Sequence, residues 1–389
     1  MTSSPRLRRP LLLTALVALA SGLVVGPAAA TGPRGPSAHL TYLSGTTIAA
    51  GATFGGTVVG GLSSLTYDAA RGVYYALSDD QGAGFTPTSS SPARFYTLRI
   101  TVSDGVLDPG DVQVLAVTTF LGPDGQPFPA QSLDPEGLTL TPQDTLVLTS
   151  EGISTRGIAP FVREFDLSGR QLDELPVPGY FAPTPPPPAT QTSGVRQNLG
   201  FEAAAVAPDG QQLFVGTENA LVQDGPAATT ATGSPARILR YHLGHGGSDR
   251  EYVYPTDPVA APSTVFTVNG LVELLPLNNE FLLAMERSFS VGAGNTIRIY
   301  RLALPGATDV SGVADIHDVA GLQPARKSLL LQLPSTINGQ PLDNVRGDDA
   351  RADPAGRPAV GAAGQRQQLH CRPGQPGPAA RAGLTNRLP

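Results

Sequence analysis

Tryptophan is absent from this 389-residue chain, cysteine occurs once and methionine twice. A single cysteine cannot close a disulfide within the chain, so sheet packing, with or without a metal ion, has to hold the fold. Charge is sparse as well: 26 Lys and Arg stand against 32 Asp and Glu, without a basic patch that contains aromatic residues. We therefore expect no nucleic-acid partner. The sequence also lacks a phosphate-binding loop, a dinucleotide fingerprint and a Gly-x-Ser-x-Gly nucleophile motif.

Long apolar runs are missing beyond the N-terminal segment. In that segment, residues 6–9 (RLRR) are basic, residues 10–25 are apolar and residues 28–30 are alanines, the order typical of a signal peptide and its cleavage site. A membrane anchor is the alternative, but the apolar run is short for a spanning helix. We expect a signal peptide over residues 1–30. The mature chain, secreted or periplasmic, would begin near Thr31 and keep no membrane attachment.

Glycine and proline are abundant, 45 and 38 in number, and they separate short apolar runs. This pattern predicts many strands joined by tight turns. Four copies of one strand pattern can be superposed. The first strands begin at residues 61–65, 135–138, 201–204 and 271–274. The second strands are residues 73–78, 145–150, 212–217 and 280–285. The third strands begin with Arg-x-Φ-x-Φ, where Φ is a large apolar residue, at residues 94–98, 163–167, 237–241 and 298–302.

Four strands in each repeat of roughly seventy residues are typical of propeller blades with long loops. We predict an all-β protein, a β-propeller of four-stranded blades. A stack of separate β-sandwiches is the alternative, but it explains less well why each repeat keeps the same charged residues in register.

The character of the chain changes after Val345. Residues 346–389 contain almost no β-branched residues and are rich in Arg, Gln, Gly, Pro and Ala. This composition predicts a disordered tail. Codons for residues 346–351 (RGDDAR), read after loss of one base, can instead encode Glu-Gly-Met-Thr-Leu, which is close to residues 136–140 (EGLTL). We hypothesise a frameshift near Arg346 that damages a fifth repeat.

The damaged repeat brings the expected number of blades to five, with six left open. An intact fifth blade would hold three C-terminal strands and take its fourth from the N-terminus, around residues 40–48, because such closure removes exposed sheet edges. In the chain as given we expect an incomplete last blade and an open ring. The propeller domain would span residues 31–345, followed by the tail over residues 346–389.

Carboxylates follow the second strands and occur in the first strands, and each third strand begins with an arginine. The start of a first strand, the end of the antiparallel second and the start of the third lie at one end of a blade. We therefore expect each acid beside the arginine of its own repeat, at one mouth of the central channel. The carboxylates are Asp79, Asp80, Glu136, Glu151, Glu202, Glu218, Glu273 and Glu286. The arginines are Arg94, Arg163, Arg237 and Arg298.

Two explanations fit these charges. In the structural one, each arginine pairs with a carboxylate and braces the strands. In the functional one, the carboxylates bind a hard cation such as Ca²⁺ through oxygen ligands. The cation and the arginines would then hold an anionic ester and activate water. Both can be true at once, and the pattern assigns no catalytic residue.

Short motifs surround the acids at residues 61–63 (GLS), 75–80 (YALSDD), 134–137 (DPEG), 198–202 (NLGFE), 285–287 (MER) and 343–345 (DNV). With them, the chain from about residue 60 to 345 resembles the exported phytase-like family, also called "esterase-like activity of phytase". The resemblance implies hydrolysis of phosphate or other esters. Ala203 departs from the usual glycine, and the changed tail lacks a last Glu and a Ser-Asp-Asn motif.

We therefore expect an exported hydrolase of small phosphate or other anionic esters, monomeric, with Ca²⁺ held by acidic residues at one mouth of the channel. The alternative is a non-catalytic propeller that binds an anionic ligand or a protein partner at the same mouth.

Sequencing the gene tests the frameshift. We expect a supernumerary base near the codon for Arg346 that close relatives lack, since its removal restores the motifs of a fifth repeat. A clean read without such a base, in this isolate and in its relatives, would contradict the hypothesis.

Overall fold

Short apolar runs between glycine-rich turns form strands, and the described residues contain no α-helix. The computed structural model describes residues 40–49, 51–82, 91–102, 105–108, 110–244, 246–337, 340–342, 345–352, 358–364 and 368–373. At residues 340–341 and from 345 on it describes the backbone alone. Every described residue lies in one compact unit, Gly35–Pro389. Four short 3₁₀ segments complete it, η1 (Ser154–Arg156), η2 (Gly179–Phe181), η3 (Val222–Asp224) and η4 (Ile316–Asp318).

The described strands form five antiparallel sheets of four strands each. The first sheet holds β4 (Leu62–Asp68), β5 (Val73–Ser78), β6 (Arg94–Ile100) and β7 (Val112–Thr119). The second holds β8 (Pro135–Leu140), β9 (Thr145–Ser150), β10 (Phe161–Asp166) and β11 (Gln171–Leu175). The third holds β12 (Phe201–Val206), β13 (Gln212–Thr217), β14 (Pro235–His242) and β15 (Ser248–Pro255). The fourth holds β16 (Thr267–Pro276), β17 (Phe281–Ser290), β18 (Gly294–Ala303) and β19 (Arg326–Leu333).

The fifth sheet joins the two ends of the described chain. It holds β1 (Leu40–Thr46), β22 (Val345–Ala352), β23 (Pro358–Gly364) and β24 (Gln368–Pro373). Two short hairpins stand outside the five sheets, β2 (Thr53–Phe54) with β3 (Thr57–Val58), and β20 (Thr336–Ile337) with β21 (Gln340–Pro341).

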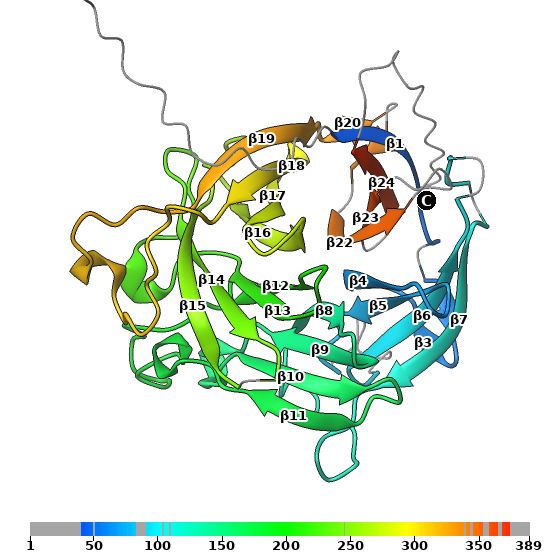
Figure 1. Cartoon of the computed structure of the whole chain (residues 1–389), viewed down its shortest axis with the longest axis horizontal. Coiled ribbons are helices and arrows are strands. Elements are labelled where there is room, and N and C mark those ends of the chain that lie inside the picture. Colours follow the sequence, from blue (N-terminus) through cyan, green and yellow to red (C-terminus); the bar gives the residue numbers. More distant parts are fainter. Residues whose placement is uncertain are drawn as a thin grey trace, which may run out of the picture. The chain divides into compact units, whose positions relative to one another are not determined.

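The inner strand of each sheet lies at the centre of a ring: it is the first strand in the first four sheets and β22 in the fifth. β4 contacts β8, β8 contacts β12, β12 contacts β16, β16 contacts β22, and β22 contacts β4, so the inner strands close a circle. The peripheral strand is the last one in each of the first four sheets and β1 in the fifth (Figure 1). The arrangement is a β-propeller, which confirms the all-β prediction and the repeat of four strands.

The fifth sheet differs from the expected incomplete blade and open ring. Its backbone has four strands, and β1 pairs with β24, with Leu40 opposite Pro373. The expected closure between a strand near the N-terminus and three C-terminal strands is therefore present in the backbone. Strand pairing uses main-chain groups that every residue except proline carries in full, so altered side chains do not by themselves prevent it. The expected signal peptide lies outside the described residues, as do residues 374–389 of the tail.

Apolar side chains fill the layers between neighbouring sheets. Tyr75 and Phe95 of the first sheet pack with Leu138 and Leu148 of the second. A separate apolar cluster between the third and fourth sheets contains Phe214, Ile238, Leu271, Leu282 and Leu302. Burying each such side chain contributes about 1.5–3 kcal/mol. The sheets are thus held in a fixed orientation, and so are the residues at their ends.

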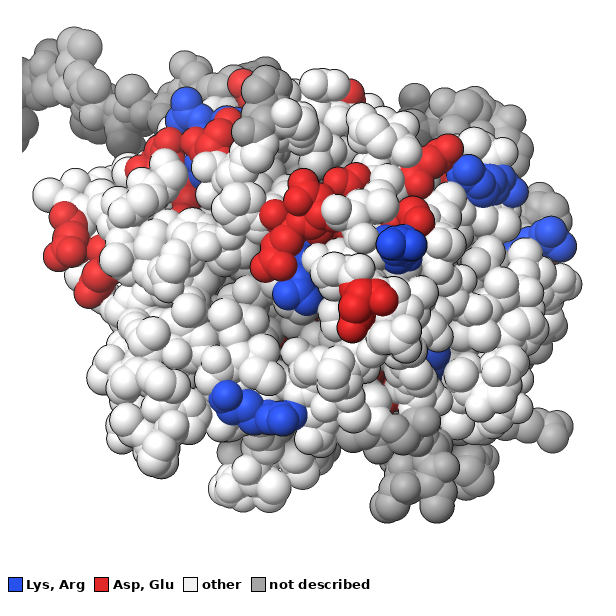
Figure 2. Space-filling view, turned by 90° about the horizontal axis from the view of Figure 1, so that it is seen from below, with Lys and Arg blue, Asp and Glu red and all other residues white. Residues whose placement is uncertain are grey.

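The surface carries little positive charge. On the side that Figure 2 shows, Lys and Arg side chains lie apart from one another and form no continuous basic area. This side therefore offers no extended surface for a polyanion.

Candidate metal and ligand site

A β-bulge recurs where the first strand meets the second in each sheet with described side chains. The register shifts between Leu62 and Ser64, Pro135 and Gly137, Phe201 and Ala203, and Leu271 and Glu273. The extra residues are Ser63, Glu136, Glu202 and Val272. A bulge turns its side chain out of the regular alternation of the strand. In the second and third sheets the side chain placed in this way is a glutamate.

In the first three sheets a second acidic position follows the end of the second strand. Asp79 donates its backbone N–H to the carbonyl oxygen of Gly61 (2.7 Å), and Glu218 donates to Gly200 (2.7 Å). The N–H of Glu151 donates to Asp134 (3.0 Å) in the same way. Each of these three sheets therefore brings three positions together at one end: the residue before the first strand, the bulge, and the residue after the second strand.

Five buried carboxylates meet where the second and third sheets adjoin. Oxygen atoms of Asp134, Glu136 and Glu151 lie within 4.8 Å of one another, and so do those of Glu151, Glu202 and Glu218. None of the five residues is more than 5% exposed. Because Glu151 belongs to both groups, the five form one acidic cluster.

Glu151 lies in unfavourable electrostatic surroundings. Burial raises the pKa of its carboxyl group well above the ordinary value, and the charges of the other four members raise it further. Its Oε1 accepts a hydrogen bond from the N–H of Gly200 (3.1 Å), whereas its Oε2 is buried without a hydrogen-bond partner among the described residues. A buried carboxylate is costly unless a proton or a cation neutralises it. Carboxylate oxygens are the ligands that Ca²⁺ and other hard cations prefer, so the donor set fits such an ion.

Two glycines make room for these glutamates. A Cβ atom on Gly200 would lie 2.3 Å from the carbonyl oxygen of Glu151. A Cβ atom on Gly270 would lie 2.2 Å from Cγ of Glu218. Glu151 therefore lies directly against Gly200, which precedes β12, and Glu218 lies against Gly270 within β16. A larger residue at either glycine would displace the glutamate.

The fourth sheet is offset by one residue from the sequence-based alignment. Its register pairs Leu271 with Glu286 and Gly270 with Arg287. Arg287, and not Glu286, therefore takes the position that Glu151 and Glu218 hold in their sheets. Likewise Val272, and not Glu273, takes the position of the bulge.

Arg287 is the cation beside the acidic cluster. Its Nη2 lies 3.2 Å from Oε1 of Glu218. Both side chains are largely buried, 8% and 1% exposed, so solvent screens the pair weakly. One guanidinium offsets one of the five carboxylates, and an excess of negative charge is left for a divalent cation or protons to neutralise.

A pocket of about 470 Å³ opens directly onto this pair. Glu218 and Arg287 form its charged part. Its walls come from loops and strand ends at the same end of the third and fourth sheets, among them Asn198, Ala227, Phe266, Phe289 and Asn295. A ligand in this pocket would touch Glu218, a member of the acidic cluster.

The sequence profile of the phytase-like family, described as "Esterase-like activity of phytase", matches residues 57–360. The chain belongs to the phytase-like family. The matched span contains all four sheets with described side chains, the acidic cluster and the pocket. The phytase-like propeller is thus the part of the chain that holds the candidate site.

The chain is also similar to a secreted fungal protein. An uncharacterized secreted protein of the fungus Arthroderma benhamiae is 24% identical over 202 residues, which cover 44% of this phytase-like chain and 38% of the fungal protein. The match thus spans about two fifths of that relative. Within the described residues, no helix has the length and apolar character needed to cross a membrane.

Solved structures show only a distant likeness to this phytase-like chain. A hypothetical protein from Leishmania major is 8% identical, with 82% and 86% of the two chains covered and a TM-score of 0.41. An endo-arabinase from Bacteroides thetaiotaomicron is 13% identical, with 83% and 96% covered and a TM-score of 0.39. The periplasmic gluconolactonase of Pseudomonas aeruginosa is 14% identical, with 80% and 88% covered and a TM-score of 0.36. Likenesses this weak carry no argument about activity.

The remaining acids of the sequence analysis lie outside the acidic cluster. Asp80 forms a buried ion pair with Arg94 (2.9 Å), as expected for neighbours at that strand end. Glu273 is buried, and one of its oxygens accepts a hydrogen bond from the N–H of Leu274 (3.0 Å). Asp79 holds its backbone position at the end of β5, without joining either carboxylate group.

Glu286 is part of a separate, neutralised network. Its carboxylate accepts hydrogen bonds from the hydroxyl of Tyr254 (2.8 Å) and the amide of Asn269 (2.9 Å), and it pairs with Lys327. These partners satisfy both oxygens, in contrast to Glu151.

Two of the predicted arginines make contacts at the outer strands. Arg163 pairs with Glu174 on β11 (3.0 Å). Arg298 donates to Gln332 (3.3 Å) and lies 3.8 Å from a carboxylate oxygen of Asp257. Arg163 therefore pairs with a different acid from Glu136 and Glu151, contrary to the expectation, whereas Arg298 lies opposite Glu286 in the strand register, as expected for neighbours of one repeat.

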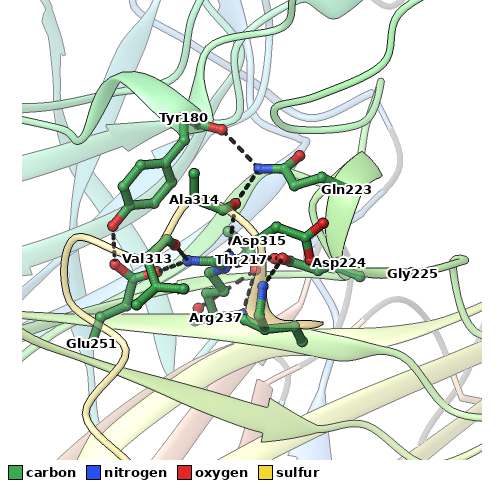
Figure 3. A network of polar contacts seen from close by, with 12 residues as sticks. Tyr180, Thr217, Gln223, Asp224, Gly225, Arg237, Glu251, Val313, Ala314 and Asp315 are labelled. Carbon is green, nitrogen blue, oxygen red and sulfur yellow. Dashed lines mark hydrogen bonds and ion pairs between the residues drawn. The ribbon is translucent and has the colours of Figure 1, made fainter. Parts of the chain in front are cut away.

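Arg237 is fully buried and braces a loop of the fourth sheet (Figure 3). Its guanidinium donates to both oxygens of Asp224 (2.6 and 2.7 Å) and to Glu251 (2.6 Å). It also donates to the carbonyl oxygens of Val313 (2.8 Å) and Ala314 (3.2 Å). All five N–H donors of Arg237 thus belong to this buried structural network, and none of them reaches the acidic cluster.

Strand alternation explains why Arg237 does not reach Glu218. Arg237 lies opposite Thr217, and its N–H donates to the Thr217 hydroxyl (2.9 Å). Side chains of successive residues point to opposite faces, so Arg237 shares a face with Thr217 and not with the next residue, Glu218. The sequence pattern therefore placed Arg237 at the correct end of its strand but on the wrong face of the sheet.

Two residues of the site were missed as ligands or anion binders. Asp134 and Arg287 belong to the family motifs, but residue type gave no reason to assign them to the cluster. Their hydrogen-bond register assigns them to the site. Asp134 precedes the first strand of its sheet, and Arg287 takes the position that Glu151 and Glu218 hold in theirs.

Arg237→Met should lower the free energy of unfolding by about 3–5 kcal/mol, because it leaves the buried carboxylates of Asp224 and Glu251 without their cation. Urea denaturation measures the change. Arg240 offers a matched control on the same strand, since it pairs with the exposed Asp249. Arg240→Met should cost less than about 1 kcal/mol. Equal losses of unfolding free energy in the two variants would show that the buried network around Arg237 does not stabilise the fold.

Ca²⁺ should stabilise the chain through the acidic cluster. At about one hundred times its Kd, a ligand of the folded state adds about 2.7 kcal/mol to the free energy of unfolding. Because the pKa of Glu151 is higher in the folded chain than its ordinary value of 4.5, ionisation of Glu151 opposes folding at neutral pH. Glu151→Gln should therefore stabilise the metal-free protein and remove most of the stabilisation by Ca²⁺.

Glu286→Gln is the matched control, a buried glutamate whose carboxylate is already neutralised by Lys327. It should destabilise the protein with and without Ca²⁺ and leave the gain from Ca²⁺ unchanged. Thermal melts with chelator and with added Ca²⁺ measure both variants. If Glu151→Gln destabilises as Glu286→Gln does, and Ca²⁺ leaves the unaltered chain unchanged, the acidic cluster is not a cation site.

Proposed function

We propose that the chain is an exported, Ca²⁺-dependent hydrolase of phosphate or other anionic esters that acts at the pocket beside the acidic cluster. One observation carries the proposal: Glu151 lies in two groups of buried carboxylates, with one oxygen that has no hydrogen-bond partner among the described residues. The acidic cluster would hold the ion, which supplies a positive charge that polarises the ester and activates water.

Arg287 is the group that would bind the anion. A guanidinium can donate two parallel hydrogen bonds to phosphate or carboxylate oxygens, and Arg287 lines the pocket. Glu218 accepts from the same guanidinium and so fixes its orientation. Glu218 therefore connects the acidic cluster with the anion-binding group.

Hydrolysis of a phosphate ester forms a bond from a water oxygen to phosphorus and breaks the bond to the ester oxygen. The proton that the water gives up ends on the leaving alcohol. Negative charge on the phosphoryl oxygens is stabilised by fixed positive groups at the site, and Arg287 is placed for this role.

Export is part of the proposal. The N-terminal sequence has the order of a signal peptide, and the fungal relative is a secreted protein. A secreted or periplasmic location also provides millimolar Ca²⁺ in many settings, which suits a site of modest affinity.

The test is release of phosphate from p-nitrophenyl phosphate by the full mature chain, with Ca²⁺ and with chelator. We expect release with Ca²⁺ alone. Glu202→Gln and Arg287→Lys should each lower kcat/KM about 10²-fold or more. The first variant removes a proposed cation ligand, and the second removes the pair of parallel hydrogen bonds that a guanidinium donates to an anion.

Arg298→Lys is the control for Arg287→Lys, because Arg298 lies on the neighbouring strand and contacts the outer strand β19. It should leave kcat/KM unchanged. Folding that is independent of metal, together with no release from any ester, would favour the non-catalytic propeller that binds an anionic ligand.

A further inference from the structure

We propose that the pocket selects esters with one anionic group and one apolar, preferably aromatic, group, and that it discriminates against polyanions such as inositol polyphosphates. This inference rests on the proposed function for the place of the anionic group, and it names the class of substrate.

The charges of the pocket suit a single anion. Among the described residues that line it, Arg287 is the only Arg or Lys and Glu218 the only acid. One guanidinium binds one phosphate or carboxylate group in bidentate fashion. The further phosphates of a polyanion would meet no second cation among these residues, and they would lie near the negative charge of the acidic cluster.

The walls of the pocket are largely apolar. The rings of Phe266 and Phe289 pack against each other at an interplanar angle of 43°, with centroids 6.3 Å apart, and Val268 and two alanines, Ala227 and Ala228, also line the pocket. Two rings in contact form one apolar wall, against which a planar apolar group can pack by its face or its edge. An apolar group next to the anion would therefore be removed from water.

The apolar character continues onto the rim. Phe266 is 55% exposed, its neighbour Val265 is 76% exposed, and Val291 is 42% exposed. The N–H of Val291 donates to the carbonyl oxygen of Phe266 (3.1 Å), which places the two segments side by side. Three of the six exposed large apolar side chains in the described part of the chain thus gather at this rim. Such a concentration of exposed apolar surface is typical of a ligand site.

The size of the pocket agrees with this class. A volume of about 470 Å³ lies in the range of pockets that bind small molecules. It accommodates a phosphate group and one or two aromatic rings. The apolar part would rest against Phe266 and Phe289 while the anion reaches Arg287.

Binding of stable phosphonates tests the inference without any need for turnover. The probes are naphthylmethylphosphonate, methylphosphonate and inositol trisphosphate, measured by calorimetry on the full mature chain with Ca²⁺. We expect the naphthyl compound to bind at least about tenfold more tightly than the other two. Phe266→Ala should remove about tenfold of its affinity, as expected for loss of one aromatic contact.

Leu172→Ala is the matched control, since Leu172 is similarly exposed, 53%, but lies on the outer strand β11. It should leave all three affinities unchanged. Equal binding of the naphthyl and methyl compounds, or tighter binding of the trisphosphate with no effect of Phe266→Ala, would overturn the ligand class. If the expected binding pattern appears but no ester is hydrolysed, the ligand class stands and the proposed hydrolysis fails.

Discussion

Repulsion between buried carboxylates is the constraint around which the second, third and fourth sheets are arranged. Glu151 and its four neighbours would separate if the chain allowed it, because each raises the pKa of the Glu151 carboxyl group. Their positions are instead fixed by backbone: two lie in bulges, one precedes a first strand, and two follow second strands. The ring of inner strands, sealed by apolar layers, holds these segments together.

The molecule treats its buried charges in two distinct ways. Around Arg237, and around Glu286, every carboxylate oxygen meets a cation or a hydrogen-bond donor, and these networks tie loops to sheets. In the acidic cluster negative charge is in excess, and Arg287 offsets part of it at one side only. Breaking a neutral network costs stability, whereas an unbalanced one is costly to keep. An unbalanced cluster is therefore better explained by a ligand than by bracing.

The sequence patterns predicted the fold and most of the acidic cluster, and the reason is physical. Turn residues and alternating apolar residues mark strands locally, and antiparallel pairing then places Glu136, Glu151, Glu202 and Glu218 at the same strand ends. In the fourth repeat, the acids were aligned by residue type, and this alignment was wrong. Glu273 and Glu286 are glutamates, like the bulge and strand-end residues of the second and third repeats. Hydrogen-bond register instead aligns Val272 and Arg287 with them. A shift of one residue reverses the face of a side chain, so residue type alone could not detect it.

The offset in the fourth sheet has a chemical consequence for the whole site. Had the acids kept their register, the fourth sheet would add two further carboxylates next to Glu218. Val272 and Arg287 stand there instead, and the pocket beyond them contains Phe266, just before β16, and Phe289, near the end of β17. The site thus changes along the ring from purely acidic, suited to a cation, to cationic and apolar, suited to an anion with an apolar group. A divalent cation and an organic anion are complementary in charge, and this change would place the proposed cation site and the proposed anion site within the length of one side chain, Glu218.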